Sequence, residues 1–126
     1  MAYPADSDQV PLSIQVADDE ASILDALSRF LRHSGHTVQT AETAQSALAL
    51  AAEHRFDVVL ADANMPGGGR KVLAHLKDDP SFSGQLVLMA GGSAADYVND
   101  LGEGIDFLEK PFTFDALPKL VGMSDA

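Results

Sequence analysis

The sequence predicts an α/β fold: a single doubly wound sheet of five parallel strands covered by five helices. Two observations lead to this prediction. Short apolar runs typical of strands alternate along the chain with segments whose apolar residues recur at helical spacing. The run at 58–61 is continuously apolar and is bounded by turn residues, as expected for a strand buried on both faces of a parallel sheet. With 126 residues, the chain is long enough for one such domain and too short for two.

Composition and charge exclude several classes of function. A hydrophobic content of 46% and a charged content of 21% are typical of a globular protein. A net charge of −11 argues against non-specific binding to nucleic acid or to an anionic membrane. The absence of cysteine excludes disulfides, thiolate metal sites and thiol nucleophiles. The polar N-terminus and the lack of a long apolar run predict a cytoplasmic protein without a signal peptide.

The first half of the chain contains three of the expected strands and two of the helices. Polar residues 1–10 are expected to form a flexible tail before a domain at 11–122, and a short tail at 123–126 follows it. The strands are expected at 12–17, 36–40 and 58–61. Helical spacing of apolar residues from Ile23 to Leu31 predicts the first helix, and Gly35 stands where a helix commonly ends. Thr43 is placed to cap the second helix.

The second half continues the same alternation. A third helix is expected at about Arg70–Lys77, with Val72, Leu73 and Leu76 on its buried face. A fourth strand at 86–90 is stopped by glycines, and Ser93 begins a weak fourth helix that reaches Leu101. A fifth strand at 105–108 is followed by a last helix at 114–121, which Thr113 is expected to cap.

Charged residues gather where three of these strands end. Asp18 and Asp19 follow the first strand, Asp62 follows the third, and Lys110 follows the fifth. Parallel strands end at the same edge of the sheet, so these side chains are expected to lie together. Clustered carboxylates persist where a cation offsets their repulsion, and an oxygen-only ligand set favours Mg²⁺. The fourth strand ends in Ala90 and glycines, whose backbone N–H groups are available to an anion.

These parts together predict a phosphoryl-transfer site. An aspartate can itself be the nucleophile and form an aspartyl phosphate, and a lysine beside it can hold the phosphoryl group. Each residue alone has a simpler explanation, such as a helix-end acid or a loop lysine. Their placement at three strand ends favours the functional interpretation. Gly67–Gly69 is expected to form a flexible turn rather than a phosphate cradle, because no Lys-Ser or Lys-Thr follows it.

Three motifs carry a resemblance to a known family. Val16–Glu20, Asp62–Gly67 and Lys110–Phe112 resemble, in order and spacing, the motifs of receiver domains of bacterial two-component response regulators. The resemblance covers about residues 12–121. It implies a flavodoxin-like sheet with the strand order 2-1-3-4-5.

The resemblance also implies a role for each motif residue. Asp62 corresponds to the phosphoacceptor, which receives phosphate from a phosphohistidine on a histidine kinase or a histidine phosphotransfer protein. The implied Mg²⁺ ligands are Asp19, Asp62 and the backbone carbonyl of Asn64, with Asp18 acting through water. The implied phosphate-binding groups are Lys110, Ala90 and Gly91, and Phe107 corresponds to the switch aromatic. The Lys110–Pro111 bond is expected to be cis.

Two departures from the family's pattern affect the expected switch. Ala90 stands where the family usually has serine or threonine, and the loop after Pro66 is about one residue short. The expected function is that of a two-component receiver with no enzymatic activity beyond its own phosphorylation and autodephosphorylation. It is expected to signal through partner contacts, and a homodimer through the fourth helix, fifth strand and fifth helix is one expected assembly.

Two other functions compete with this one. The first is an atypical receiver that acts as a largely phosphorylation-independent interaction module, which Ala90 favours and the intact Asp18, Asp19, Asp62 and Lys110 oppose. The second is a Mg²⁺-dependent hydrolase of the haloacid-dehalogenase type. Those enzymes have an Asp-x-Asp motif after the first strand, whereas the acids here are adjacent, so this function is disfavoured.

Overall fold

A computed structural model of the chain describes residues 11–91, 101–102 and 104–117. In this part of the chain, five parallel strands form one sheet in the order β2-β1-β3-β4-β5. The strands are β1 (Ser13–Ala17), β2 (Thr37–Ala41), β3 (Val58–Asp62), β4 (Gln85–Ala90) and β5 (Ile105–Glu109). The predicted sheet and its strand order are therefore confirmed, with strand boundaries within one residue of those expected.

The described residues contain three α-helices where five were expected for the whole chain. They are α2 (Ala21–His33), α3 (Ala44–Glu53) and α4 (Gly69–Lys77), and a 3₁₀ helix, η1 (Phe114–Ala116), follows β5. Most of the expected fourth helix at 93–101 lies outside the described residues, as does the expected last helix beyond residue 117. The two predicted tails at 1–10 and 123–126 also lie outside them.

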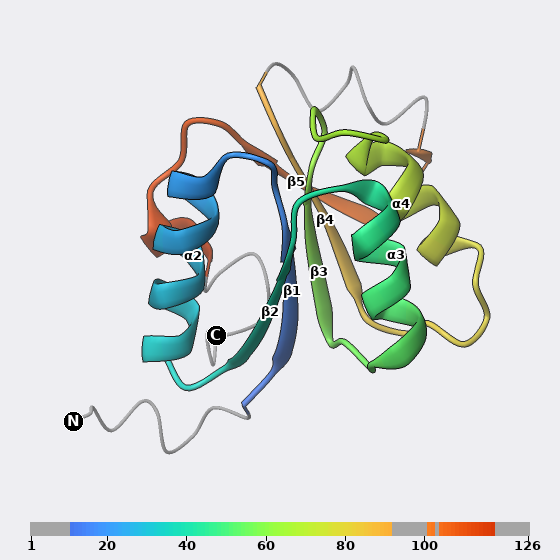
Figure 1. Cartoon of the computed structure of the whole chain (residues 1–126), viewed down its shortest axis with the longest axis horizontal. Helices are drawn as coiled ribbons and strands as arrows, with labels where there is room; N and C mark the ends of the chain where they lie inside the picture. The colour runs from blue at the N-terminus through green and yellow to red at the C-terminus, as the bar shows by residue number, and fades with distance from the viewer. Residues whose placement is uncertain (1–10, 92–100, 103, 118–126) are drawn as a thin grey trace.

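The helices cover both faces of the sheet, as a doubly wound fold requires. Figure 1 shows α2 on one face and α3 and α4 together on the other. Each face has its own core. The α2 face buries larger aliphatic side chains: Ile14, Val16, Leu27, Leu31, Leu60 and Met89. The opposite face is rich in alanine: Ala17, Ala41, Ala44, Ala47, Ala61 and Ala90, with Met65, Val72 and Leu73.

The helix ends follow from local sequence. Thr43 Oγ1 accepts a 3.1 Å hydrogen bond from the backbone N–H of Ser46, and Ser46 Oγ accepts one of 3.3 Å from the N–H of Thr43. This reciprocal capping box confirms the predicted start of α3. Helix α2 ends at His33, and Gly35 follows its C-cap residue, Ser34, where the sequence predicted the end of the helix. The predicted cap at Thr113 is wrong, because its hydroxyl bonds to the Asp115 carboxylate and caps no backbone N–H.

Asp57 joins the starts of three strands at the amino edge of the sheet. Its side chain accepts a 2.8 Å hydrogen bond from the N–H of Ser13, and its own N–H donates one of 2.7 Å to the carbonyl of Ser13. Its backbone carbonyl accepts a third, of 2.8 Å, from the N–H of Gln85. The registers of β1, β3 and β4 are thus fixed at the edge opposite the predicted site.

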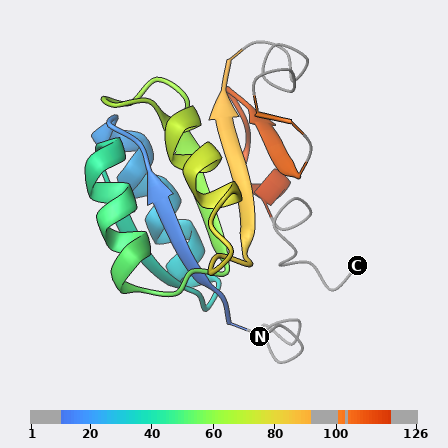
Figure 2. The same ribbon diagram turned by 90° about the vertical axis from the view of Figure 1, so that its right-hand side faces the viewer.

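The end of α4 is joined to the segment that precedes β5. Lys77 Nζ donates a 2.6 Å hydrogen bond to the carbonyl of Leu101. Gln85 Nε2, at the start of β4, donates one of 2.5 Å to the carboxylate of Asp106 on β5. Figure 2 shows β5 at the edge of the sheet beside β4, where these side-chain contacts supplement the backbone ladder.

Candidate metal and phosphoryl site at the carboxyl edge

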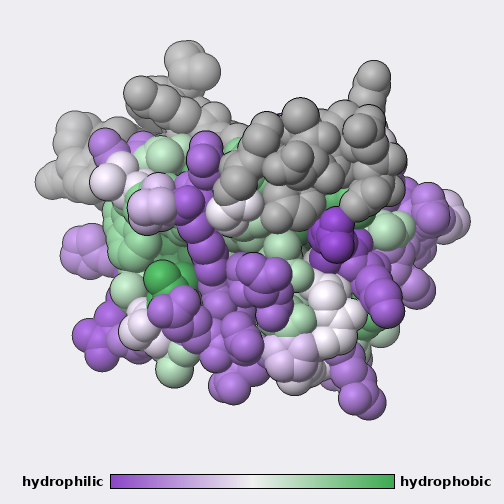
Figure 3. Space-filling model, turned by 90° about the horizontal axis from the view of Figure 1, so that it is seen from above, coloured by the Kyte–Doolittle hydropathy of each residue, from purple (hydrophilic) through white to green (hydrophobic). Residues whose placement is uncertain are grey.

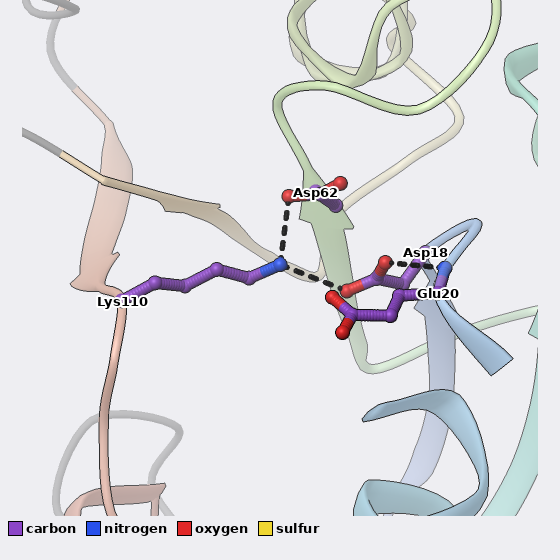
Figure 4. A network of polar contacts seen from close by, with 4 residues as sticks. All are labelled: Asp18, Glu20, Asp62 and Lys110. Carbon is purple, nitrogen blue, oxygen red and sulfur yellow. Dashed lines mark hydrogen bonds and ion pairs between the residues drawn. The ribbon is translucent and has the colours of Figure 1, made fainter. Parts of the chain in front are cut away.

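Four charged residues at the ends of three strands meet at the carboxyl edge of the sheet. Lys110 Nζ lies 3.0 Å from Oδ1 of Asp62 and 3.1 Å from Oδ2 of Asp18 (Figure 4). Asp18, Asp19 and Asp62 each have a carboxylate oxygen within 4.8 Å of the others. The structure therefore brings these residues together, as their positions at the strand ends predicted.

The two acids of the first strand have different surroundings. Asp18 is fully buried, and its Oδ1 accepts a 2.9 Å hydrogen bond from the N–H of Glu20 while its Oδ2 contacts Lys110. The backbone N–H of Asp18 donates a 3.0 Å bond to the carbonyl of Ala41. Asp19, in contrast, is exposed. Asp18 is thus held at both oxygens and at its backbone, whereas Asp19 is open to solvent and to an incoming ligand.

The site carries more negative than positive charge. Burial raises the pKa of the Asp62 carboxyl, the hydrogen bond from Lys110 opposes that rise, and the nearby charge of Asp18 adds to it. For Lys110, burial lowers the pKa, but the hydrogen bonds to Asp62 and Asp18 outweigh burial and leave the pKa raised. Three carboxylates face one ammonium group, so a cation bound here would relieve repulsion that a single lysine leaves uncompensated.

The chemistry of the donor set fits Mg²⁺. Among the described residues, the cluster offers carboxylate oxygens and contains neither histidine nor cysteine, which suits a hard cation. Asn64 lies in the turn two residues beyond Asp62, and its side chain is exposed. The N–H of Ala63 donates a 2.9 Å hydrogen bond to the carbonyl of Met89, which fixes the start of this turn. The residues that would hold the metal are Asp18, Asp19, Asp62 and the Asn64 carbonyl.

The loop after Pro66 forms a turn, as expected from its three glycines. The N–H of Gly68 donates a 2.8 Å hydrogen bond to the carbonyl of Met65, whose side chain is buried. Helix α4 begins at Gly69, which lies so close to the backbone of Asp62 that a Cβ there would overlap the Asp62 carbonyl oxygen. The glycines thus allow α4 to begin directly against the end of β3.

The residues implied for phosphate binding and switching lie around this cluster. Ala90, the last residue of β4, is fully buried, and its carbonyl accepts a 2.9 Å hydrogen bond from the N–H of Lys110. Gly91 beside it is exposed. Phe107 pairs with Leu88 and packs, partly buried, against the alanine-rich core. The Lys110–Pro111 bond is cis, as expected.

An apolar cavity of about 370 Å³, which sequence reasoning missed, opens beside the site. It is lined by Ile23 of α2, by Lys110 and Pro111, and by Phe112 and Phe114. The view from above shows hydrophobic residues gathered on the α2 side of this edge (Figure 3). Ile23 matched the spacing of a core residue, so its spacing gave no sign of this surface. The signal available was the pair of aromatic residues on either side of Thr113.

Comparison with known proteins shows the family that the three sequence motifs resemble. Residues 14–122 match the family model described as the response regulator receiver domain. The transcriptional regulatory protein TcrA of Mycobacterium tuberculosis is 35% identical over 106 residues, which cover 82% of this chain and 42% of TcrA. The response regulator MprA of Mycolicibacterium vanbaalenii is 34% identical over 110 residues, covering 86% of this chain and 48% of MprA. The chain therefore spans less than half the length of these relatives.

Solved structures with the same fold include one of about this chain's length and one that is much longer. The chemotaxis response regulator CheY4 of Vibrio cholerae superposes with a TM-score of 0.79 at 26% identity, covering 87% of this chain and 95% of CheY4. NtrX from Brucella abortus superposes with a TM-score of 0.77 at 30% identity, covering 91% of this chain and 27% of NtrX. In the described part of this chain, no helix is both long and apolar enough to span a membrane.

Proposed function

Because the chain belongs to the response regulator receiver domain family, we propose that Asp62 accepts a phosphoryl group in a Mg²⁺-dependent reaction. The donor is a phosphohistidine on a histidine kinase or a histidine phosphotransfer protein, and the phosphorylated chain signals through contacts with partner proteins. The observation that carries this proposal is the ion pair between Lys110 and Asp62 within a cluster of three carboxylates. On this proposal the chain is a cytoplasmic signalling module whose enzymatic activity is limited to its own phosphorylation and autodephosphorylation.

The chemistry is a single phosphoryl transfer. A carboxylate oxygen of Asp62 attacks the phosphorus atom, the phosphorus–nitrogen bond breaks, and its electron pair returns to the imidazole of the donor. Lys110 reaches Asp62 at 3.0 Å and is placed to neutralise charge on the transferred phosphoryl oxygens. Mg²⁺, when bound, neutralises further phosphoryl charge. Asp18, held at both oxygens, keeps the carboxylates close enough together to share a cation.

The apolar cavity beside Lys110 supports a protein, rather than a small molecule alone, as the donor. Ile23, Phe112 and Phe114 form an apolar surface next to the nucleophile. An Ile23→Asp substitution on this surface is expected to slow phosphorylation by a donor protein. Phosphorylation by acetyl phosphate, which makes no contact with that surface, should keep its wild-type rate. Equal slowing with both donors would show that Ile23 acts on the site itself.

The test of the phosphoacceptor is the intact mass of the chain after incubation with Mg²⁺ and acetyl phosphate. The mass should increase by one phosphoryl group, and EDTA or the substitution Asp62→Asn should abolish the increase. Asp57→Asn is a matched control, since Asp57 lies at the opposite edge of the sheet. An increase that persists in Asp62→Asn would exclude Asp62 as the acceptor.

One observation favours a second function, that of an atypical receiver that binds its partner largely without regard to phosphorylation. Switching of the kind usual in the family needs a hydroxyl at the end of β4, and the buried Ala90 has none. Partner binding that is equally tight before and after phosphorylation would establish this second function.

A further inference from the structure

The turn that follows Asp62 lies directly on the first residue of α3. The N–H of Ala44 donates a 2.9 Å hydrogen bond to the carbonyl of Pro66. The next residue, Gly67, approaches the methyl group of Ala44 so closely that a Cβ on Gly67 would lie 2.7 Å from Ala44 Cβ. Real Cβ atoms essentially never come within 3.0 Å of another atom in this way, so only glycine fits this contact.

Both acid-bearing segments of the site are attached to this same short stretch. The carbonyl of Ala41 accepts the hydrogen bond from the N–H of Asp18, and three residues later Ala44 holds Pro66. Between them, Thr43 forms the capping box with Ser46 that fixes the first turn of α3. The position of the turn after Asp62, relative to Asp18, is therefore set through residues 41–44.

We infer that Ala44 and Gly67 are positioning residues for the metal site. Their contact sets the position of the turn that carries the Asn64 carbonyl. On either side of Asn64, the N–H of Ala63 is bonded to Met89 and the side chain of Met65 is buried. This inference rests on the proposed function, in which that carbonyl is a Mg²⁺ ligand. Neither residue touches the reacting atoms. Each acts by fixing the backbone that presents a ligand, as outer-shell residues of metal sites do.

Two adjacent glycines offer a matched pair of substitutions. Gly67 and Gly68 have nearly the same φ, +87° and +88°, so the positive φ disfavours alanine at either position. A Cβ at Gly68 would meet only the Lys71 side chain, at 3.8 Å, whereas one at Gly67 would collide with Ala44. The comparison therefore separates displacement of the turn from the general cost of losing a glycine.

The experiment measures Mg²⁺ affinity of the whole 126-residue chain by isothermal titration calorimetry, with thermal unfolding in EDTA recorded alongside. Both variants should lower thermal stability. Gly67→Ala should also weaken Mg²⁺ binding by about tenfold or more relative to Gly68→Ala, in the range found for outer-shell substitutions. The double variant Ala44→Gly/Gly67→Ala should recover most of that affinity, because the nearest remaining Ala44 atoms would be 3.5 and 3.6 Å away.

Should Gly67→Ala fail to fold, Ala44→Gly alone tests the same contact, since it removes the methyl group that supports the turn. It should bind Mg²⁺ more weakly than wild type by severalfold. Equal affinities in Gly67→Ala and Gly68→Ala, no recovery in the double variant, or wild-type affinity in Ala44→Gly would each overturn the inference. Failure of the wild-type chain to bind Mg²⁺ or to gain phosphate would instead overturn the proposed function.

Discussion

The ammonium nitrogen of Lys110 lies 3.0 Å from Oδ1 of Asp62, although the two residues come from strands separated by β4. The same nitrogen lies 3.1 Å from Asp18, so one lysine holds two carboxylates that would otherwise repel each other. Phosphorylation of Asp62 would turn one carboxylate oxygen into the bridging oxygen of an acyl phosphate and place phosphoryl oxygens near the lysine. We therefore expect this ion pair to be the first contact that changes.

The first prediction concerns Lys110→Ala. Acetyl phosphate should still phosphorylate this variant, because the metal neutralises part of the phosphoryl charge without the lysine. The response to phosphorylation should be reduced, since the lysine links the phosphoryl group to β5. The measurement is the set of amide chemical-shift changes on adding a beryllofluoride mimic. Shift changes along β5 identical to those of wild type would show that Lys110 takes no part in the response.

The second prediction concerns Asp19, the exposed acid of the cluster. Asp19→Ala should abolish measurable Mg²⁺ affinity, because it removes one of the three clustered carboxylates. The fold should stay intact, because Asp19 is exposed. Thermal stability without metal should stay the same or rise, since one repelling charge is lost. Calorimetric titration with Mg²⁺ checks the first statement, and wild-type affinity in the variant would remove Asp19 from the ligand set.

The third prediction is a pH dependence that arises from Asp62. The folded state raises the pKa of this carboxyl above 3.8, so the folded chain binds the proton more tightly than the unfolded chain. The resulting stabilisation is complete below pH 3.8 and is lost as the pH rises through the folded-state pKa. In EDTA, Asp62→Asn should therefore gain stability relative to wild type as the pH rises from 4 to 7. Unfolding curves at several pH values measure this difference, and a constant difference would contradict the assigned cause.

The fourth prediction concerns the missing hydroxyl at Ala90. Wild-type protein should show only a small shift of β5 and Phe107 on phosphorylation, because alanine offers no side-chain donor to a phosphoryl oxygen. Such a bond would contribute about 1.5–3 kcal/mol, the scale of a typical coupling between two sites. Ala90→Thr should enlarge the shift.

Valine is the matched control for this threonine. Ala90 is fully buried, so either larger side chain must displace its neighbours, and Ala90→Val adds the same bulk without the hydroxyl. Amide chemical shifts with a beryllofluoride mimic should change more in Ala90→Thr than in Ala90→Val. A large wild-type shift that reaches Phe107 and is unchanged by Ala90→Thr would mean that the chain switches by another route.

The fifth prediction concerns stability at the edge far from the site. Asp57→Ala should destabilise the fold by roughly 1–3 kcal/mol, because it leaves the N–H of Ser13 without its side-chain acceptor. Asp57→Asn retains an acceptor oxygen and should cost less. Mg²⁺ affinity should be unchanged in both variants. Denaturant unfolding and calorimetry together test this separation of stability from metal binding.

The sequence predicted the sheet and the acidic cluster because each depends on short-range pattern and on one rule of topology. Apolar runs identify the strands, and parallel strands must bring Asp18, Asp62 and Lys110 to one edge. The capping of α3 by Thr43 was likewise predictable, since a cap is a local contact.

What the sequence did not predict depends on contacts between distant segments. Asp57 bonds to Ser13 across 44 residues, and no pattern in the sequence marks an aspartate at a strand start for this role. The three glycines were noticed, but their purpose becomes clear only where the turn lies on Ala44 and the start of α4 lies against Asp62. Thr113 shows the limit of local rules, because a neighbouring acid competes for its hydroxyl.

The hydrogen bond from Lys77 to Leu101 closes a ring of contacts through the molecule. From Asp62 the chain passes through the glycine turn into α4, whose last residue is Lys77. Lys77 binds the carbonyl just ahead of β5, and β5 leads to Lys110, which returns to Asp62. Asp62 is thus linked to β5 in two ways. One is the direct ion pair with Lys110, and the other runs along helix α4, which is about 14 Å long from the rise of its nine residues. Lys77→Met removes the hydrogen bond to Leu101 and leaves the ion pair between Lys110 and Asp62 intact. This variant therefore isolates what the link through α4 contributes to the movement of β5 on phosphorylation.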